Sequence, residues 1–324
     1  MKILIILPNW LGDALMATPA IEHLSTKYPE ARFTFIGSFV SVEAIKHHPK
    51  CEASFVDKTK KQGNRLKATH AFAKSLGEFD IAITFRNNIY STLLLLFTPA
   101  FTKIARKSWH ASLLLDKVAK LDRQEHLSIQ YNNLVNLLEE NPTEPPKSKL
   151  YISKHQYEKP TLGINPGATY GSAKRWYPEK FAEVAKAFSD TYQIIIFGGP
   201  SEMDMGADIE SRLQEMGITN YLNLAGKTSI EELCSHIGGL DVFVTNDSGP
   251  MHVAAAYEVP TVAIFGPTRH FETCQWKNDK SKIVRRDDVP CAPCMKRTCP
   301  LKHHECMTKI EAAEVIEAVK EVVG

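Results

Sequence analysis

The sequence predicts an α/β protein made of two similar halves, and three features of the chain lead to this prediction. Apolar runs of strand length alternate with helical patterns along most of the 324 residues. Residues 141–149 contain three prolines and no apolar residue, so they read as a linker between two series of elements. The length also suits two domains better than one core. Two halves joined in this way imply a cleft between them, which is a usual place for ligands.

The first half begins with a continuous apolar run at residues 2–7, which is typical of a parallel strand covered on both faces. A polar loop follows, and then a helical pattern at residues 14–24. Pro19 should kink this helix or delay its start, because proline lacks the backbone N–H group. Residues 32–36 and 80–84 are the next expected strands.

The alternation of elements restarts after the linker. The expected strands are residues 161–164, 193–197, 241–245 and 261–265, and the expected helices are residues 178–188, 230–237, 251–257 and 310–323. We therefore expect domains at residues 1–150 and 151–310. A C-terminal helix at residues 311–324 follows, and the N-terminal domain is one surface on which it could pack.

Composition limits the class of protein. The chain is 44% apolar and 23% charged, as in ordinary soluble globular proteins. No apolar run reaches the ~18 residues that cross a bilayer, and the apolar segment at residues 93–97 is expected to lie in a core. The first residues lack the long apolar region and cleavage site of a signal peptide, which favours a cytoplasmic location.

Charge is distributed unevenly between the halves. Residues 1–150 hold 20 Lys and Arg against 14 Asp and Glu, whereas residues 151–324 hold 19 against 23. A basic first half could attract an acidic partner such as a phosphorylated glycolipid or a nucleic acid. Chance asymmetry on a solvated surface is an equally good explanation.

The loops that follow strands are the candidate sites, because ligands of open α/β sheets bind beyond the carboxyl ends of the strands. The first such loop is residues 9–13, in which Gly12 permits a tight turn. Asp13 is either a helix cap or a general base that takes a proton from an attacking hydroxyl. Spacing alone favours the cap.

The second loop, residues 165–176, holds two glycines and two adjacent cations, Lys174 and Arg175. Glycine lets backbone N–H groups face a phosphate, and lysine supplies a compact positive charge. The alternative is a solvated loop beside a buried Trp176. The density of phosphate-binding groups favours a functional loop.

The third loop, residues 246–252, joins an expected strand to an expected helix. Pro250 suits a first helical position, and a helix N-terminus can hold a diphosphate. Asp247 would repel that phosphate, so it fits better as an acceptor for sugar hydroxyls or as a cap. His252 could donate to a phosphate, although a lone helical histidine is more often structural.

Two nucleotide-binding motifs fail. Residues 225–228 look like the end of a Walker A loop, but Tyr221 stands where its first glycine is required. No G-x-G-x-x-G pattern follows the run at residues 2–7 or the run at residues 193–197. This absence weakens the hypothesis of a nicotinamide-dependent dehydrogenase.

A cysteine cluster lies near the C-terminus, with two histidines inside it. A structural zinc site is one hypothesis, but the spacing of the last two cysteines is wider than usual, and we do not favour it. The alternatives are reduced thiols in a compact loop or an oxidation-prone cluster. The residues concerned are Cys291, Cys294, Cys299 and Cys306, with His303 and His304.

Four segments together carry a resemblance to a known family: residues 9–13, residues 165–168 with 173–176, residues 245–252 and residues 265–268. In this order they resemble the bacterial ADP-heptose:lipopolysaccharide heptosyltransferases, over nearly the whole chain. The Lys174-Arg175-Trp176 form and the Cys-Ala-Pro-Cys cluster are more similar to heptosyltransferase II than to heptosyltransferase I.

The resemblance implies a GT-B fold of two Rossmann-like domains facing across a cleft, with acceptor bound by the first and nucleotide-sugar by the second. It implies inverting, metal-independent transfer from ADP-heptose onto the first heptose of the inner core linked to Kdo and lipid A. No cofactor and no nucleic acid are expected, and the contact with the inner membrane should be peripheral. The alternatives are heptosyltransferase I or a transferase with another acceptor or nucleotide-sugar, an NAD-dependent dehydrogenase, and a non-catalytic nucleotide-sugar binder.

The resemblance also implies roles for individual residues. Asp13 would be the catalytic base, and Lys174 would neutralise the departing diphosphate. Acceptor-binding residues stay undefined, although basic side chains of the first half are available: Lys58, Lys60, Lys61, Arg65, Arg86 and Arg106. In the donor, the diphosphate would be bound by Thr169, Ser248 and Gly249, with His252 nearby. The heptose hydroxyls would be bound by Asp247. The ribose would be bound by Glu202 and the adenine by Thr228.

Overall fold

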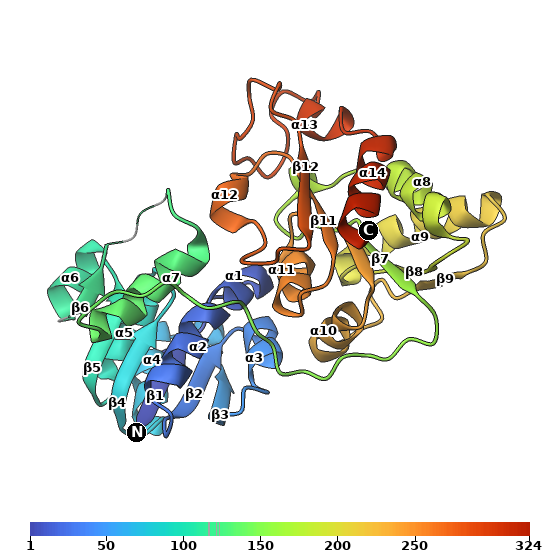
Figure 1. Cartoon of the computed structure of the whole chain (residues 1–324). Helices are drawn as coiled ribbons and strands as arrows, with labels where there is room; N and C mark the ends of the chain where they lie inside the picture. Colours follow the sequence, from blue (N-terminus) through green and yellow to red (C-terminus); the bar gives the residue numbers. More distant parts are fainter. Residues whose placement is uncertain (116, 121, 123) are drawn as a thin grey trace. The chain divides into compact units, whose positions relative to one another are not determined.

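The computed structural model describes residues 1–115, 117–120, 122 and 124–324. The chain divides into two compact units, Met1–Tyr151 and Ile152–Gly324. Each unit contains one six-stranded parallel sheet with helices (Figure 1), so the predicted α/β class is confirmed. Within the described residues, no helix is both long enough and apolar enough to cross a membrane.

The sheet of the first unit has the strand order β3-β2-β1-β4-β5-β6. Its strands are β1 (Lys2–Ile6), β2 (Arg32–Gly37), β3 (Cys51–Val56), β4 (Phe79–Thr84), β5 (Ala100–Arg106) and β6 (Lys117–Ala119). Its helices are α1 (Leu11–Met16), α2 (Thr18–Lys27), α3 (Phe39–Ile45), α4 (Arg65–Ser75), α5 (Ile89–Phe97), α6 (Trp109–Leu114) and α7 (Leu127–Val135).

The start of the chain shows how local sequence sets these elements. β1 pairs with β2 and β4, and its apolar residues from Ile3 onward are fully buried. The helix expected at residues 14–24 is two helices, α1 and α2, which meet at Ala17. Pro19 lies in the first turn of α2, where its missing N–H group is tolerated. The predicted interruption by Pro19 is therefore confirmed, but the first helix begins earlier than expected.

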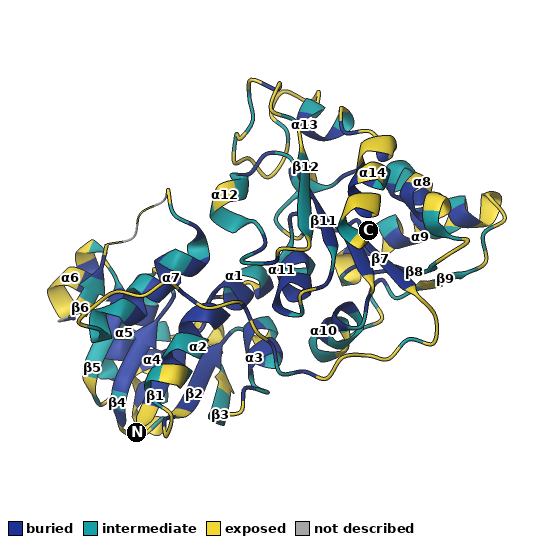
Figure 2. Ribbon diagram, viewed as in Figure 1, coloured by how far each residue is buried: buried dark blue, intermediate teal, exposed yellow. Residues whose placement is uncertain are grey.

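The sheet of the second unit has the order β12-β11-β10-β7-β8-β9. Its strands are β7 (Thr161–Asn165), β8 (Gln193–Ile196), β9 (Tyr221–Asn223), β10 (Val242–Asn246), β11 (Thr261–Phe265) and β12 (Ser281–Arg285). Its helices are α8 (Pro178–Phe188), α9 (Met203–Glu215), α10 (Ile230–Gly238), α11 (Gly249–Ala256), α12 (His270–Thr273), α13 (Glu305–Thr308) and α14 (Ala312–Val323). The central strands of both sheets are the most buried parts of the units (Figure 2).

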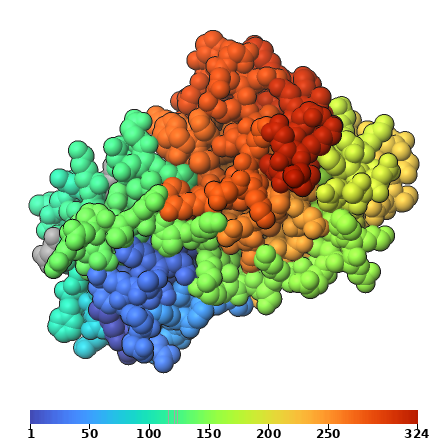
Figure 3. Space-filling view, in the orientation of Figure 1, coloured from blue at the N-terminus to red at the C-terminus, as the bar shows by residue number. Residues whose placement is uncertain are grey.

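The C-terminal helix α14 belongs to the second unit. Val315, Ala318 and Val319 are buried in the core that covers β10, β11 and β12, and α14 also packs against α8. Figure 3 shows α14 in dark red beside the yellow-green α8 on the surface of this unit. The buried face of α14 therefore packs on the core of the second unit, and not on the N-terminal domain as the sequence analysis allowed.

Both sheets reverse their strand order at a central pair of strands. The reversal lies between β1 and β4 in the first unit and between β7 and β10 in the second. In open α/β sheets, the loops that leave such a pair diverge and form a crevice at the carboxyl ends of the strands. The loops after β1, β4, β7 and β10 are therefore where a site is expected.

Candidate functional site

The predicted donor-binding residues all follow strands of the second unit's sheet, on its carboxyl edge. Thr169 and Lys174 follow β7, Glu202 follows β8, Thr228 follows β9, and Asp247, Ser248, Gly249 and His252 follow β10.

Lys174 and Asp247 form an ion pair at the reversal point between β7 and β10. Lys174 Nζ lies 2.5 Å from Asp247 Oδ2, and their side chains are 12% and 3% exposed. Thr268 Oγ1, which follows β11, donates to the same carboxylate oxygen at 2.5 Å. Thr268 received no role from the sequence, although it ends the segment 265–268 that carried part of the resemblance. The cation and the carboxylate predicted for the donor are thus held together, and Thr268 belongs to the same cluster.

Two buried asparagines at the ends of β7 and β10 fix the loops around this pair. Asn246 accepts from Trp176 N–H at 3.1 Å and donates to Pro166 O at 2.7 Å. Asn165 donates from Nδ2 to Ser248 Oγ at 3.2 Å. A buried side-chain amide needs partners for both its N–H donors and its oxygen acceptor. Each asparagine therefore fixes the position of the loop to which it is hydrogen-bonded. Both asparagines lie in segments that carry the resemblance, but their side-chain partners could not be inferred from the sequence.

The turn that carries Lys174, Ser172–Lys174, is supported by the cysteine-containing loop. Ala173 N–H donates to Arg297 O at 3.0 Å, and His304 Nε2 donates to Ala173 O at 2.9 Å. The Tyr170 hydroxyl donates to Met295 O at 2.8 Å. Lys174 Nζ lies 4.8 Å from the centroid of the Tyr170 ring, within cation–π range. The position of the Lys174 ammonium group therefore depends on residues about 120 positions later in the chain.

Glu202 is a buried carboxylate that follows β8, one strand further along the edge. Its Oε2 accepts the Gly199 N–H at 2.8 Å, and Arg175 Nη2 lies 3.9 Å from its Oε1. Oε1 is buried and has no hydrogen-bond partner among the residues that the structure describes. An ionised carboxylate accepts hydrogen bonds only, so this oxygen is suited to the hydroxyls of a sugar.

Gly167 packs directly against the Glu202 carboxylate. A Cβ atom at Gly167 would lie 2.1 Å from Glu202 Oε2, which is far inside van der Waals contact. Gly167→Ala should therefore displace Glu202, the residue to which the resemblance assigns the ribose. On that assignment the affinity for ADP should fall by about 10-fold, the cost of roughly one lost hydrogen bond to a charged group. Calorimetric titration with ADP measures this, and Gly63→Ala, where the added Cβ meets nothing within 4 Å, is the control.

The loop after β10 leads into α11, which begins at Gly249, two residues earlier than expected. Ser248 occupies the N-cap position, and Pro250 lies in the first turn, as predicted. The free N–H groups of such a turn attract anions. His252 is 5% exposed and closes this first turn.

Thr169 and Thr228 follow strands that are separated by β8 in the sheet. Thr169 is exposed in the turn after β7, whereas Thr228 is half-buried in the loop after β9. Gly226 N–H donates to Gly198 O at 2.8 Å, which joins the loop of Thr228 to the loop of Glu202. The four loops therefore form one continuous polar edge in the order of the strands.

Asp13, the predicted base, lies in the first unit at the carboxyl end of β1. It is the third residue of α1, whose N-cap position is taken by Trp10, so the hypothesis of an Asp13 cap is wrong. Asp13 is half-buried. Burial raises the pKa of the Tyr131 hydroxyl well above its ordinary value, and the negative charge of Asp13 raises it further while Arg106 opposes both. Asp13 of α1 and Arg106 of β5 are thus both close enough to Tyr131 of α7 to influence its ionisation.

The four clustered cysteines have free thiols and line one cavity of the second unit. Within residues 1–115, 117–120, 122 and 124–324, no three His, Cys, Asp or Glu side chains are arranged to share a metal ion. Cys306 is the most buried of the four. Burial and the neighbouring Cys294, Cys291 and Cys299 raise the pKa of its thiol to about 11.

Thiol reactivity should follow this difference, because the thiolate is the form that reacts with alkylating agents. At pH 8, iodoacetamide should modify Cys306 at least about 10-fold more slowly than Cys299, its half-buried neighbour. Peptide mass spectrometry over a time course measures the two rates. Equal rates in the folded protein would contradict the burial described, and unfolding in urea should equalise them.

Comparison with known proteins agrees with this geometry. Residues 69–305 match the model of glycosyltransferase family 9 (heptosyltransferase). The chain is 38% identical to lipooligosaccharide heptosyltransferase 2 of Campylobacter jejuni over 99% of its own length and 98% of that protein. It is 28% identical to lipopolysaccharide heptosyltransferase 2 of Escherichia coli K12 over 83% of each chain.

A solved structure extends the likeness to the fold. The E. coli ADP-heptose lipopolysaccharide heptosyltransferase II aligns with a TM-score of 0.82 and 26% identity, over 100% of this chain and 98% of that one. The two sheets described above are accordingly the two Rossmann-like domains of a GT-B glycosyltransferase. From the matched family model and the full-length similarity, the chain belongs to glycosyltransferase family 9 and is a heptosyltransferase.

Proposed function

We propose that this enzyme transfers heptose from ADP-heptose onto the first heptose of the lipopolysaccharide inner core, with inversion at the anomeric carbon. The similarity to proteins named heptosyltransferase 2 supports the acceptor, and the name of the solved E. coli structure supports the donor. The family excludes the dehydrogenase hypothesis, since its members transfer sugars.

The observation that carries the donor assignment is the order of polar groups along the carboxyl edge of the second sheet. The strand order β10-β7-β8-β9 places Asp247, Lys174, Glu202 and Thr228 in that sequence. Adjacent strands are about 4.8 Å apart, so the four loops span roughly 14 Å. A nucleotide-sugar laid along this edge would put its sugar at Asp247, its diphosphate at Lys174, its ribose at Glu202 and its adenine at Thr228.

The diphosphate position combines two sources of positive potential. Lys174 lies next to Asp247, which follows β10, and the N-terminus of α11 begins two residues later at Gly249. Negative charge grows on the diphosphate as the bond to heptose breaks, so fixed positive groups stabilise the transition state more than the ground state. Asp247 keeps the Lys174 ammonium group in place before the donor arrives.

Asp13 supplies the other half of the chemistry in this proposal. An inverting transfer needs a base that removes the proton from the attacking hydroxyl as the new bond forms. Asp13 stands at the carboxyl end of the central strand of the first sheet, where such a base is expected. The half-buried Arg106 and the exposed Lys58, Lys60 and Lys61 suit an acceptor that carries phosphates and carboxylates. Arg86 does not belong to this set, because its side chain is buried and paired with Asp57.

We further propose a cytoplasmic enzyme that touches the inner membrane from one side. A lipid-linked acceptor requires access to the surface of the leaflet, and excess Lys and Arg in residues 1–150 favours an anionic surface.

One assay tests the proposal. Purified enzyme is incubated with ADP-heptose and either a Kdo–lipid A acceptor or the same acceptor with one heptose, and products are weighed by mass spectrometry. Gain of one heptose on the second acceptor alone is the expected result, and an NMR coupling constant identifies the anomer. Gain on the first acceptor alone would instead identify heptosyltransferase I activity.

A further inference from the structure

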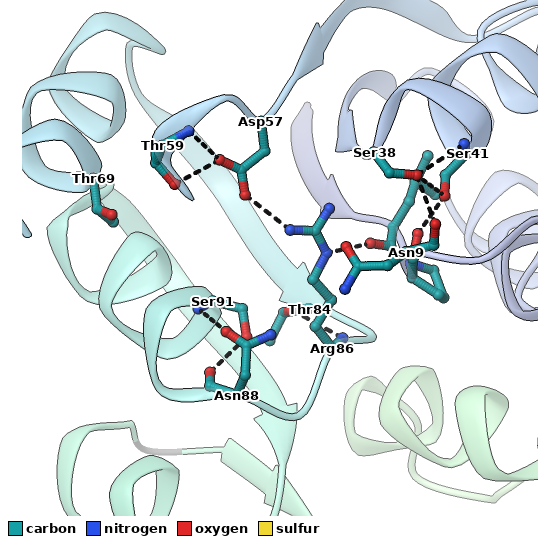
Figure 4. A network of polar contacts seen from close by, with 12 residues as sticks. Asn9, Ser38, Ser41, Asp57, Thr59, Thr69, Thr84, Arg86, Asn88 and Ser91 are labelled. Carbon is teal, nitrogen blue, oxygen red and sulfur yellow. Dashed lines mark hydrogen bonds and ion pairs between the residues drawn. The ribbon is translucent and has the colours of Figure 1, made fainter. Parts of the chain in front are cut away.

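The loop between β1 and α1 is held by an unusual set of hydrogen bonds. The backbone carbonyl groups of residues 7–9 each accept a hydrogen bond from a side chain. Arg86 Nε donates to Leu7 O at 2.7 Å. Ser41 Oγ donates to Pro8 O, and Ser38 Oγ donates to Asn9 O at 2.7 Å. Figure 4 shows Arg86 approaching from one side of Asn9 and the two serines from the other.

These donors come from the two strands that flank β1 in the sheet. Ser38 and Ser41 follow β2, and Arg86 follows β4. The loop that leaves β1 is therefore fixed from both sides at the reversal point. It reaches the start of α1 at Leu11, only two residues after Asn9, and Asp13 lies two residues further. A displacement of the three carbonyls would move the first turn of α1 and the Asp13 carboxylate with it.

The donors are themselves immobilised. Asp57 Oδ2 lies 2.9 Å from Arg86 Nη1, and the two side chains are 12% and 7% exposed. Thr59 donates to Asp57 Oδ1 from its N–H group at 3.0 Å and from its hydroxyl at 2.7 Å. Burial opposes ionisation of Asp57, but the bonds from Thr59 and the charge of Arg86 outweigh it and lower its pKa. Asp57 thus stays charged at neutral pH and orients the guanidinium.

Ser38 is fixed in a different way. It is the N-cap of α3, so its hydroxyl oxygen accepts from Ser41 N–H at 3.2 Å while its proton goes to Asn9 O. Both functions of the hydroxyl are used, and one of them has no part in capping. The bond to Asn9 is therefore a feature that an ordinary cap does not require.

We propose that Ser38, Ser41 and Arg86 form a carbonyl clamp that positions Asp13 for proton abstraction. They are positioning residues: they act on turnover through the loop, and this inference rests on the proposed role of Asp13. The clamp has two arms, which are Arg86 on one side of the loop and the pair Ser38 and Ser41 on the other. Because catalysis is sensitive to displacements of about 1 Å, loss of one arm should slow transfer about 10-fold or more and leave the affinity for donor unchanged.

The decisive variant is Ser38→Ala, with Ser108→Ala as its matched control. Ser108 is the N-cap of α6, accepts from Ala111 N–H at the same distance of 3.2 Å, and contacts His110 Nδ1 at 3.1 Å. Both variants lose a cap and should lower the melting temperature similarly. We expect only Ser38→Ala to lower kcat per folded molecule by about 10-fold, without a change in donor KM. Ser38→Thr, which retains the hydroxyl, should recover kcat.

Arg86→Gln tests the other arm, and Lys27→Met is its control because Lys27 makes a 2.8 Å ion pair with Glu139 in the same unit. Combined with Ser38→Ala, Arg86→Gln should reduce kcat by less than the product of the two single effects, since both act on one loop. If Arg86→Gln fails to fold, the Ser38 comparison decides alone.

Hydrogen exchange separates this inference from the proposed function. In Ser38→Ala the amides of residues 9–13 should exchange at least several-fold faster than in Ser108→Ala, whether or not heptose is transferred. If Ser38→Ala shows this faster exchange while the wild-type enzyme fails to transfer heptose to the one-heptose acceptor, the clamp on the loop stands and the proposed acceptor reaction is wrong. Equal exchange and equal kcat per folded molecule in the two serine variants would overturn the clamp.

Discussion

An Asp13→Asn enzyme is expected to bind ADP-heptose as tightly as the wild type and to transfer heptose about 10²–10⁴-fold more slowly. This range is the usual contribution of a positioned general base. The substitution keeps the size of the side chain and removes the basic oxygen. Donor affinity should be unaffected because the residues assigned to the donor belong to the second unit, whereas Asp13 belongs to the first. Steady-state rates with calorimetric titration of ADP separate the two effects.

The stability of this variant should change little. Asp13 lies in the first turn of α1, where its negative charge interacts favourably with the helix N-terminus, so its loss costs about 0.3–1 kcal/mol. Asp80→Asn is a suitable control. Asp80 accepts a 2.7 Å bond from Lys2 N at the amino end of the same sheet, away from the predicted site. Turnover by Asp13→Asn at the rate of Asp80→Asn would rule out Asp13 as the base.

The sequence predicts those elements of this fold whose local signals agree with one another. α8 runs from Pro178 to Phe188 as expected, because a proline at its start and one apolar face point to the same helix. Strands β3, β5, β6, β9 and β12 were missed. β6 and β9 are three-residue edge strands, and their extended form is set by pairing with Ile104–Arg106 of β5 and Ile194–Ile196 of β8. Edge strands of that length carry little preference of their own.

The candidate site was also predictable only in part. The types of residue and their loops could be read from the chain, because glycine, lysine and aspartate after a strand have a chemical meaning at that place. The hydrogen-bond partners of these residues could not be predicted from the sequence. Arg86 meets a backbone oxygen 79 positions away, and Thr268 meets Asp247 21 positions away. Such contacts are fixed only when parallel strands bring separate loops to one edge, and a single sequence carries no signal of that.

Lys174→Met is the second substitution expected to have a large effect, and it should act on both activity and stability. Loss of the cation should reduce kcat/KM by about 10²–10³-fold, as for other fixed groups that stabilise a departing charge. It also leaves the Asp247 carboxylate, 3% exposed, without its counter-charge. Breaking a buried pair in this way costs about 3–5 kcal/mol, so the free energy of unfolding should fall by that order.

The two effects can be separated in one protein, because each has a different origin. Adding Asp247→Asn to Lys174→Met removes the orphaned charge and keeps an acceptor for the Thr268 hydroxyl, so urea unfolding should return toward the wild-type midpoint. Transfer should stay at least about 10²-fold reduced, because the diphosphate still lacks its cation and the heptose has lost the Asp247 carboxylate. If the double variant regained transfer along with stability, Lys174 would be a structural partner of Asp247 alone, and stabilisation of the departing diphosphate would have to come from the N-terminus of α11.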